Sequence, residues 1–143
     1  MENYIRIEFP AKSCNEAFAR AAAGAFAAQL DITVEELADI KTAVSEAVTN
    51  AIVHGYADIR GIVEMKCRVS GNTIEIIITD KGHGIADVAL AMQPLYSGSS
   101  DEERSGMGFT VMQSFMDTLQ VDSRVGEGTT VTMTKKVGAF FDD

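Results

Sequence analysis

A glutamate and an asparagine lie four residues apart, at Glu46 and Asn50, in the stretch Ile40 to Tyr56, whose apolar residues recur at three- and four-residue steps. That spacing predicts a helix with one buried face. The opposite face carries short, mostly uncharged side chains, which indicates that something other than bulk water covers it. Residues one helical turn apart share a side, so both side chains are placed to act on one ligand. Such a pair is most often an ordinary surface pair, so its meaning depends on motifs further along the chain.

A carboxylate at the end of a predicted strand is the second candidate. Within the strand from Thr73 to Asp80, Asp80 shares its parity with three isoleucines, and successive strand side chains alternate between faces. An ionised carboxylate buried without partners is costly, so Asp80 is expected to accept hydrogen bonds from protein, water or ligand donors. Thr129, in a later predicted strand, also shares the parity of buried residues. The pattern therefore predicts two polar groups aimed into an apolar layer.

Glycines follow these candidates at two places. Gly82 and Gly84 come directly after Asp80, and the segment from Ile85 to Ser105 that follows has little periodicity, which is typical of a lid or a disordered loop. The run Gly106-Met107-Gly108 then opens a predicted helix from Phe109 to Thr118. Such a start presents free backbone N–H groups to an anion, so a phosphate-binding loop is expected there.

The composition limits the classes of protein to which the chain can belong. Its 143 residues, 46% of them hydrophobic, suffice for one domain, and we expect a single domain over residues 1–143. A net charge of -9 leaves no basic stripe for a phosphate backbone, which argues against direct nucleic-acid binding. Two distant cysteines suggest neither a zinc site nor a disulfide scaffold. Without a signal-peptide pattern or a membrane-spanning apolar run, we expect a soluble cytoplasmic protein that does not bind a membrane.

Alternating strands and helices are predicted around these residues. Helices are expected from Ser13 to about Leu30 and from Thr33 to Gly55, each opened by a capping box with a glutamate three residues on. Period-two alternation predicts strands over residues 4–9, 61–69, 73–80, 119–125 and 129–135. We therefore expect an α+β fold, a two-layer α/β sandwich in which a mixed, mainly antiparallel sheet of about five strands is covered by helices on one face.

The order of these pieces resembles the GHKL ATP-binding fold, the histidine-kinase-like ATPase fold that gyrase, the Hsp90 chaperones, MutL and histidine kinases share. Within that superfamily the chain is most similar to the small bacterial anti-sigma factors with serine-kinase activity, above all to the sporulation type. The similarity is carried by SEAVTNAIVHGY, DKGHGI and ERSGMGFTVM, and it extends from the first predicted strand to the last. The segment from Tyr96 to Ser100 is richer in glycine and serine than that family leads us to expect, which bears on the lid rather than on the chemistry.

The resemblance implies a role for each candidate residue. Asp80 would accept a hydrogen bond from the exocyclic amine of adenine, and Thr129 would support the same edge. Asn50 would ligate Mg²⁺ at the phosphates of ATP, and Glu46 would be the general base on the incoming hydroxyl. Arg104 would add charge against the transferring phosphoryl group. The other nucleotide-binding positions would be His54, Gly82, Gly84, Ser105, Gly106 and Gly108.

Two of these residues have a second interpretation. His54 lies near the predicted end of its helix, where the helix dipole favours a histidine whether or not a phosphate is bound. Arg104 has Glu102 and Glu103 as neighbours and would form an ion pair with one of them if it took no part in the transfer.

The family implies an ATP-dependent protein-serine kinase that binds and inhibits an RNA polymerase sigma factor, with sporulation sigma F as the first expectation. Its phosphoacceptor would be a serine of a small anti-anti-sigma protein, its cofactors ATP or ADP with Mg²⁺, and its assembly a homodimer. Three alternatives stay open. A histidine-kinase catalytic domain fits poorly, because the chain has two histidines and no second helical hairpin. The others are a non-catalytic module that sequesters a sigma factor with ATP bound, and a general-stress-type anti-sigma kinase.

Overall fold

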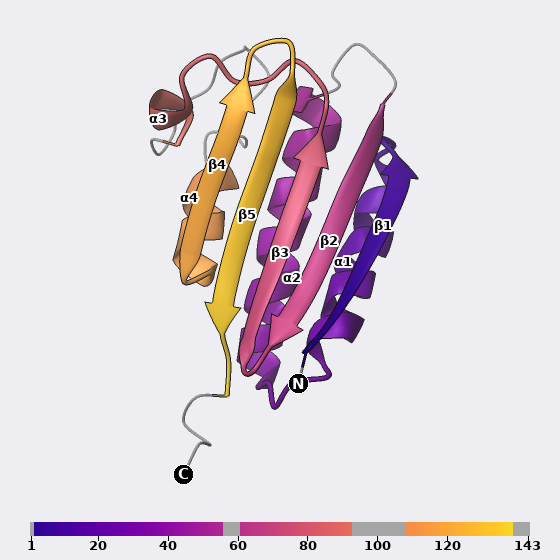
Figure 1. Cartoon of the computed structure of the whole chain (residues 1–143), viewed down its shortest axis with the longest axis vertical. Coiled ribbons are helices and arrows are strands. Elements are labelled where there is room, and N and C mark those ends of the chain that lie inside the picture. Colours follow the sequence, from indigo (N-terminus) through magenta and orange to yellow (C-terminus); the bar gives the residue numbers. More distant parts are fainter. Residues whose placement is uncertain (1, 56–60, 93–107, 139–143) are drawn as a thin grey trace.

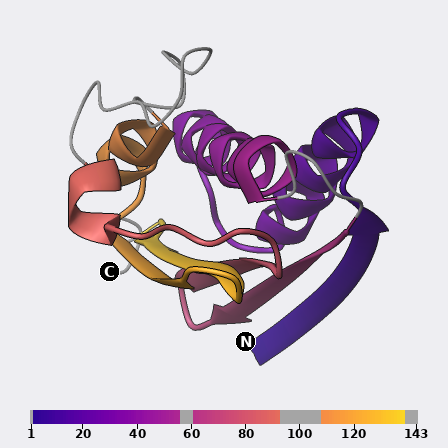
Figure 2. The ribbon, with the colours of Figure 1, turned by 90° about the horizontal axis from the view of Figure 1, so that it is seen from above.

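The computed structural model describes residues 2–55, 61–92 and 108–138, and for residues 54 and 55 the backbone alone. This part of the chain forms two layers, a five-stranded sheet and a set of helices against one of its faces (Figures 1 and 2). The α+β sandwich expected from the sequence is therefore confirmed. None of the helices in the described ranges is long and apolar enough to cross a membrane.

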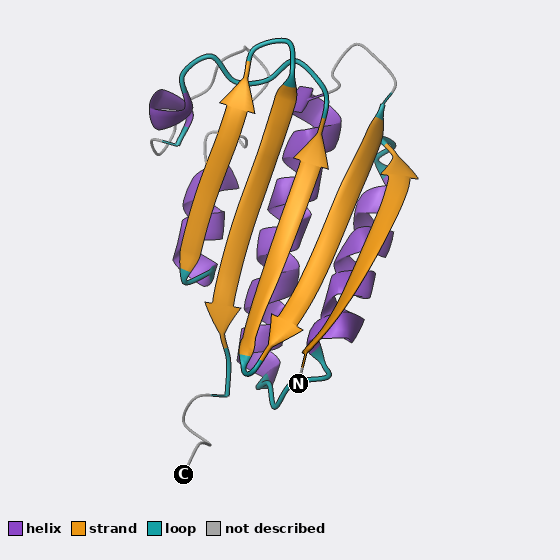
Figure 3. Ribbon diagram, in the orientation of Figure 1, coloured by secondary structure: helices purple, strands orange, loops and turns teal. Residues whose placement is uncertain are grey.

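The sheet has the strand order β1-β2-β3-β5-β4, and all four of its ladders are antiparallel. We expected a mixed sheet, but no ladder among the described residues is parallel, because β2–β3 and β4–β5 are hairpins and β5 runs opposite to β3 (Figure 3). The strands are β1 (Glu2–Pro10), β2 (Ile62–Ser70), β3 (Thr73–Asp80), β4 (Thr118–Arg124) and β5 (Gly128–Lys136).

The helix layer is centred on α2 (Val34–Thr49), which continues into a π-helix, η1 (Asn50–Gly55). On either side of α2 lie α1 (Cys14–Ala27) and α4 (Gly108–Phe115), as Figure 2 shows. A short helix, α3 (Val88–Ala91), lies apart from them. The buried stripe predicted for α2 is confirmed, and the short side chains on its flanks are explained by the two helices that pack beside it.

One of the two predicted capping boxes is present. The Thr33 hydroxyl accepts from the Glu36 N–H, and the Glu36 carboxylate accepts from the Thr33 N–H, each at 3.0 Å. The box at Ser13 was wrong, because that residue makes no side-chain cap. The Glu16 carboxylate that would have closed it instead accepts from the Ser45 hydroxyl at 2.6 Å and from Arg20 at 3.0 Å.

The predicted ends of the helices differ from the observed ones by a few residues. The helical run through α2 and η1 ends at Gly55 as expected, whereas α1 ends at Ala27 rather than near Leu30. The helix predicted to reach Thr118 ends at Phe115, because Thr118 already pairs with Thr134 as the first residue of β4.

Candidate functional site

Asp80 and Thr129 are the two buried polar side chains of the described residues, with 6% and 9% of their surface exposed. Asp80 ends β3, and Thr129 lies directly opposite it near the start of β5. Both face the helix layer, with the parity that the sequence predicted. Two polar groups kept out of water at one end of the sheet are therefore available to a ligand that reaches between the layers.

Hydrogen bonds from the backbone hold the Asp80 carboxylate. Its Oδ1 accepts from the Gly82 N–H at 2.9 Å, which turns the chain sharply after β3. Burial raises the pKa of Asp80 above its ordinary value, and the N–H groups of Gly82 and Thr129, with the charge of His83, offset part of that rise. The carboxylate is therefore positioned in advance but poorly solvated, which favours a ligand that brings a further donor.

Two further glycines, Gly84 and Gly128, allow close backbone approaches. Gly84 has a φ of 78°, and a Cβ there would collide with the Arg124 carbonyl. Gly128 has a φ of 102°, and a Cβ there would collide with the Asp80 carbonyl. Both positions thus require glycine. The contact of Gly82 and Gly84 with a nucleotide stays a prediction. In the structure Gly84 lets the loop after Asp80 lie against the β4–β5 hairpin.

Asn50 lies where α2 becomes the π-helix η1, a kind of turn that is frequent at functional sites. The η1 turn packs against the same end of β3 and β5 that carries Asp80 and Thr129. Gly108, the first residue of α4, lies beside the Asn50 amide, since a Cβ on it would be 3.1 Å from Nδ2 and 3.2 Å from Oδ1. The glycine predicted to let the backbone close on phosphates is thus adjacent to the predicted metal ligand.

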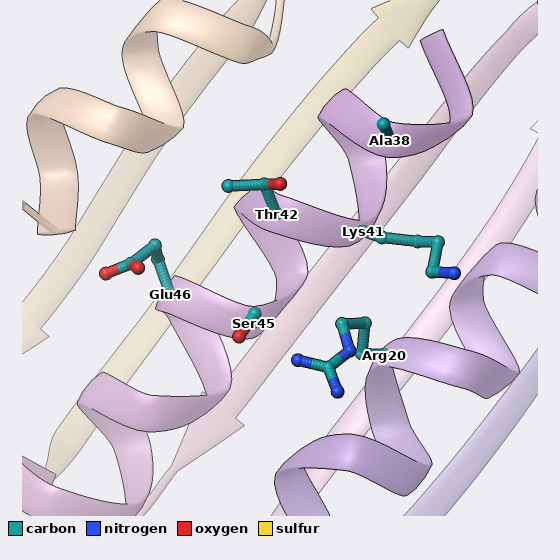
Figure 4. A pocket seen from close by; sticks show the side chains of 6 residues that line it. All are labelled: Arg20, Ala38, Lys41, Thr42, Ser45 and Glu46. Atoms are coloured by element: carbon teal, nitrogen blue, oxygen red, sulfur yellow. The ribbon is translucent and has the colours of Figure 1, made fainter. Parts of the chain in front are cut away.

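Glu46 lines a shallow groove of about 290 Å³ between α1 and α2. Figure 4 shows Arg20 reaching from α1 toward α2 and Lys41 reaching from α2 toward α1, while the Glu46 carboxylate points away from both. Glu46 lies one helical turn before Asn50, as predicted. The groove gives a partner molecule an approach to this side of α2, and two cations flank it in a chain whose net charge is -9.

Several predicted site residues lie outside the described part of the chain. They are Arg104, Ser105 and Gly106, together with the side chain of His54 and most of the predicted lid. Their assigned roles remain predictions.

A metal ion at this site would be held by the Asn50 amide oxygen and by oxygens of the bound phosphates. Among the described residues, no group of three or more histidine, cysteine, aspartate or glutamate side chains could hold a metal. Mg²⁺ usually keeps several waters and binds few protein groups, so it does not require such a cluster.

The sequence analysis missed Ser123, whose hydroxyl contacts both segments that flank Asp80. It shares its strand parity with Leu119 and Val121, which pack toward the core. The same parity argument that singled out Asp80 and Thr129 would have found it.

Comparison with known proteins shows the family of the chain. The family model of the "Histidine kinase-like ATPase domain" matches residues 9–135. Anti-sigma F factor from Thermoanaerobacter sp. (strain X514) is 58% identical over 137 residues, 96% of each chain, and that of Caldanaerobacter subterraneus subsp. tengcongensis is 56% identical over 136 residues, 95% of each.

Solved structures support the fold alone. The crystal structure of the RsbU and RsbW domains of Rv1364c from Mycobacterium tuberculosis aligns with a TM-score of 0.66 at 19% identity, covering 94% of this chain and 32% of that one. A blue-light activated histidine kinase, Erythrobacter litoralis EL346, aligns with a TM-score of 0.58 at 24% identity, over 75% of this chain and 32% of that one.

A sheet covered on one face by helices, with a buried carboxylate at one end, belongs here to a histidine kinase-like ATPase domain. Within that class, the identity and coverage of the curated relatives place the chain in the anti-sigma F factor family.

Proposed function

We propose that this chain is an ATP-dependent protein-serine kinase that also binds and inhibits an RNA polymerase sigma factor, with sigma F as the first candidate. The observation that carries the proposal is the buried pair Asp80 and Thr129 at the end of the fold where Asn50 meets Gly108. The printed names of the relatives support the sigma-binding half. The phosphoacceptor is proposed to be a serine of an anti-anti-sigma protein.

Asp80 is proposed to read the adenine ring. Its carboxylate already accepts from the Gly82 N–H, and a carboxylate oxygen has room for a further donor. An exocyclic amine supplies that donor, whereas the carbonyl that guanine presents at the same place would face a negative charge. Asp80 therefore selects adenine in two ways, because it attracts the amine of adenine and repels the carbonyl of guanine.

Asn50 and Gly108 are proposed to serve the phosphate end. Bound Mg²⁺ would neutralise phosphate charge during transfer, and the Asn50 amide oxygen is a suitable ligand for it. Gly108 leaves room beside that amide and starts α4, whose first N–H groups have no partners within the helix. ATP or ADP with Mg²⁺ are the proposed cofactors.

Glu46 is proposed to take the proton from the acceptor serine, because it lies one turn from Asn50 and beside an open groove. Because the Glu46 carboxylate points away from Arg20 and Lys41 (Figure 4), the acceptor serine would have to reach it from the side of α2 that is turned away from these two cations. We further propose a cytoplasmic homodimer that binds neither nucleic acid nor a membrane, in keeping with the acidic charge.

The test compares two variants of one helix with radiolabelled ATP, the anti-anti-sigma partner and a parallel sigma-binding assay. Asn50→Ala should weaken Mg-ATP binding and phosphotransfer together. Glu46→Gln should leave binding nearly intact and lower the transfer rate by about 10²–10⁴-fold. Glu35→Gln, an exposed glutamate on the same helix, is the matched control and should change neither.

Two outcomes would contradict parts of the proposal. A wild-type transfer rate in Glu46→Gln would exclude Glu46 as the general base. If the wild-type protein binds ATP and sigma factor but phosphorylates no such partner, the chain is a sigma-sequestering module and not a kinase.

A further inference from the structure

Lys135 is a cation in the row of β5 side chains that faces the helix layer. Alternate residues of a strand face the same side, so Lys135 continues the row of Val131 and Met133, which are buried. Only 13% of the Lys135 side chain is exposed, and its neighbour in the ladder, Ile74, is fully buried. Keeping an ammonium group away from water costs free energy unless it has partners. An apolar side chain would fill this place at a lower cost, so packing alone does not explain the lysine.

The partners of this ammonium group belong to two different helices. Lys135 Nζ donates to the carbonyl of Phe115, the last residue of α4, at 2.7 Å. The same nitrogen lies 3.7 Å from Oδ2 of Asp39 on α2. The last turn of α4 contains no basic residue of its own, so Lys135 supplies the cation that the carbonyl end of a helix favours. One side chain therefore joins β5 to α2 and to α4.

The helices α2 and α4 lie side by side, and named residues mark both ends of their contact. At one end Phe115 and Asp39 share the Lys135 ammonium group. At the other end Gly108 lies beside the Asn50 amide. With a rise of about 1.5 Å per residue, about 10 Å of helix separates Gly108 from Phe115, and about 16 Å separates Asp39 from Asn50. Lys135 thus holds the end of α4 that lies farther from the proposed phosphate site.

A separate hydrogen bond attaches the chain after α4 to the sheet. The Asp117 N–H donates to the Thr134 carbonyl at 2.8 Å. This bond involves β5 alone and does not set the direction of α4 relative to α2. The Lys135 ammonium group does so, because it holds the last carbonyl of α4 beside a carboxylate of α2. The direction of the helix in turn decides where its first residue, Gly108, lies relative to the metal ligand proposed above.

We propose that Lys135 is a positioning residue for the phosphates of the nucleotide, which aligns α4 with α2 and so keeps the first N–H groups of α4 next to Asn50. Lys135 touches no nucleotide itself, since it lies at the other end of α4. This inference rests on the proposed function, to which it adds a residue that acts on the phosphates and not on the base. Asp80 and Thr129 belong to the sheet, so their proposed contacts with the base do not depend on α4.

Binding of two ligands tests this inference. Mg-ATP carries phosphates, whereas adenosine presents only the base and the ribose. Lys135→Met keeps the length of the side chain without the ammonium group. Calorimetry should show Mg-ATP binding about tenfold more weakly in this variant, as when other residues that hold a metal ligand in place are removed. An NMR titration should show adenosine binding as in the wild-type protein. Lys135→Arg keeps a cation and should restore the affinity for Mg-ATP.

Lys136→Met is the matched control. Lys136 is the next residue of β5, and its side chain is exposed. Its N–H donates to the Asp117 carboxylate at 2.7 Å, and this backbone contact survives the substitution. The control should bind both ligands as the wild-type protein does. A loss of Mg-ATP affinity in the control equal to that in Lys135→Met would show that any cation at this end of β5 has the effect, and would overturn the role of Lys135.

The ratio of the two affinities separates positioning from simple stabilisation. A lysine that only stabilises the fold would change the melting temperature of Lys135→Met and leave the ratio at its wild-type value, which would overturn the inference. Equal weakening of both ligands would also overturn it. In both cases the binding of ATP by the wild-type protein stands, whereas a wild-type protein that does not bind Mg-ATP would reject the proposed function itself.

A second variant keeps the inference open to test if Lys135→Met does not fold. Asp39→Asn removes the charge of the carboxylate through which Lys135 reaches α2, and 25% of that side chain is exposed. The ratio of Mg-ATP affinity to adenosine affinity should fall in this variant too. A wild-type ratio in a folded Asp39→Asn protein would show that α2 and α4 stay aligned without this contact, and would overturn the inference.

Discussion

Single residues carry the predictable part of the site. Strand parity alone placed Asp80 and Thr129 on the buried side, because a strand puts alternate residues on one face whatever its neighbours are. Parity could not show that the two lie opposite each other, since residues 81–127 lie between β3 and β5 in the sequence. Only the order of strands in the sheet brings these two strands together. Helical spacing likewise put Glu46 and Asn50 on one side but said nothing of Gly108, which comes from another helix.

Replacing Asp80 by asparagine is expected to weaken ATP binding by about 1.5–3 kcal/mol, because a hydrogen bond to a charged group is lost. Calorimetry on the folded variant measures this. Asp122→Asn is the control, since that aspartate is exposed on β4 and bonds only with Gln120 among the partners described for it. Unchanged ATP affinity in Asp80→Asn would remove Asp80 from the site.

The same substitution is expected to stabilise the protein without nucleotide. Burial raises the pKa of Asp80 above its ordinary value of 3.8. The Gly82 and Thr129 N–H groups and the charge of His83 lower this pKa, but by less than burial raises it. A carboxyl whose pKa is raised by folding stabilises the fold below 3.8, and this contribution is lost as pH rises through the raised value. Nucleotide-free Asp80→Asn should therefore melt at a higher temperature than wild type at neutral pH, and the difference should narrow toward pH 3.8. A less stable variant at neutral pH would show that the hydrogen bonds outweigh the burial.

Among the elements, local signals succeeded where no distant residue displaced the local partner. The Thr33–Glu36 box formed because both partners lie within one turn, and the distant Gly138 N–H, which also donates to the Glu36 carboxylate at 3.4 Å, uses the other oxygen. At Ser13 the local signal failed, because Glu16 bonds to Ser45 on the neighbouring helix at 2.6 Å. Contact between α1 and α2 thus overrode a local preference, and no sequence pattern at Ser13 records it.

The contact between α2 and α4 is tested by Gly108→Ala. The new methyl group would lie 3.1–3.2 Å from the Asn50 amide, so the amide must shift. Because Asn50 is assigned to Mg²⁺, the gain in ATP affinity that magnesium provides should fall by about 10- to 100-fold. The affinity for ATP without magnesium should change less. Titrations with and without magnesium measure this. Gly24→Ala, at a buried helix glycine whose Cβ would lie nearest to the flexible Lys41 side chain, is the control. An intact magnesium effect in Gly108→Ala would separate Asn50 from the metal.

At the scale of the whole molecule, the site is made by both layers at one end of the sandwich. The sheet provides Asp80 and Thr129, and the helix layer provides Asn50 on η1 and Gly108 on α4. The two layers meet there through η1, which packs on β3 and β5. The opposite end, where the β2–β3 turn lies, shares no residue with the site. A ligand that contacts both layers should therefore suppress local opening at this end of the molecule more than at the other end.

Hydrogen exchange with and without Mg-ATP tests this asymmetry. At about 100 times the dissociation constant, bound nucleotide adds about 2.7 kcal/mol to any opening that breaks the site, which slows exchange by about 100-fold. Amides of the sheet side, such as Gly82 and Ile85, should slow together with those of η1 and the start of α4. The Val137 N–H, which donates to the Asn72 carbonyl at the other end, is the internal reference and should change far less. Slowing confined to the sheet side would mean that the ligand never reaches Asn50, and the assignment of the metal to η1 would fail.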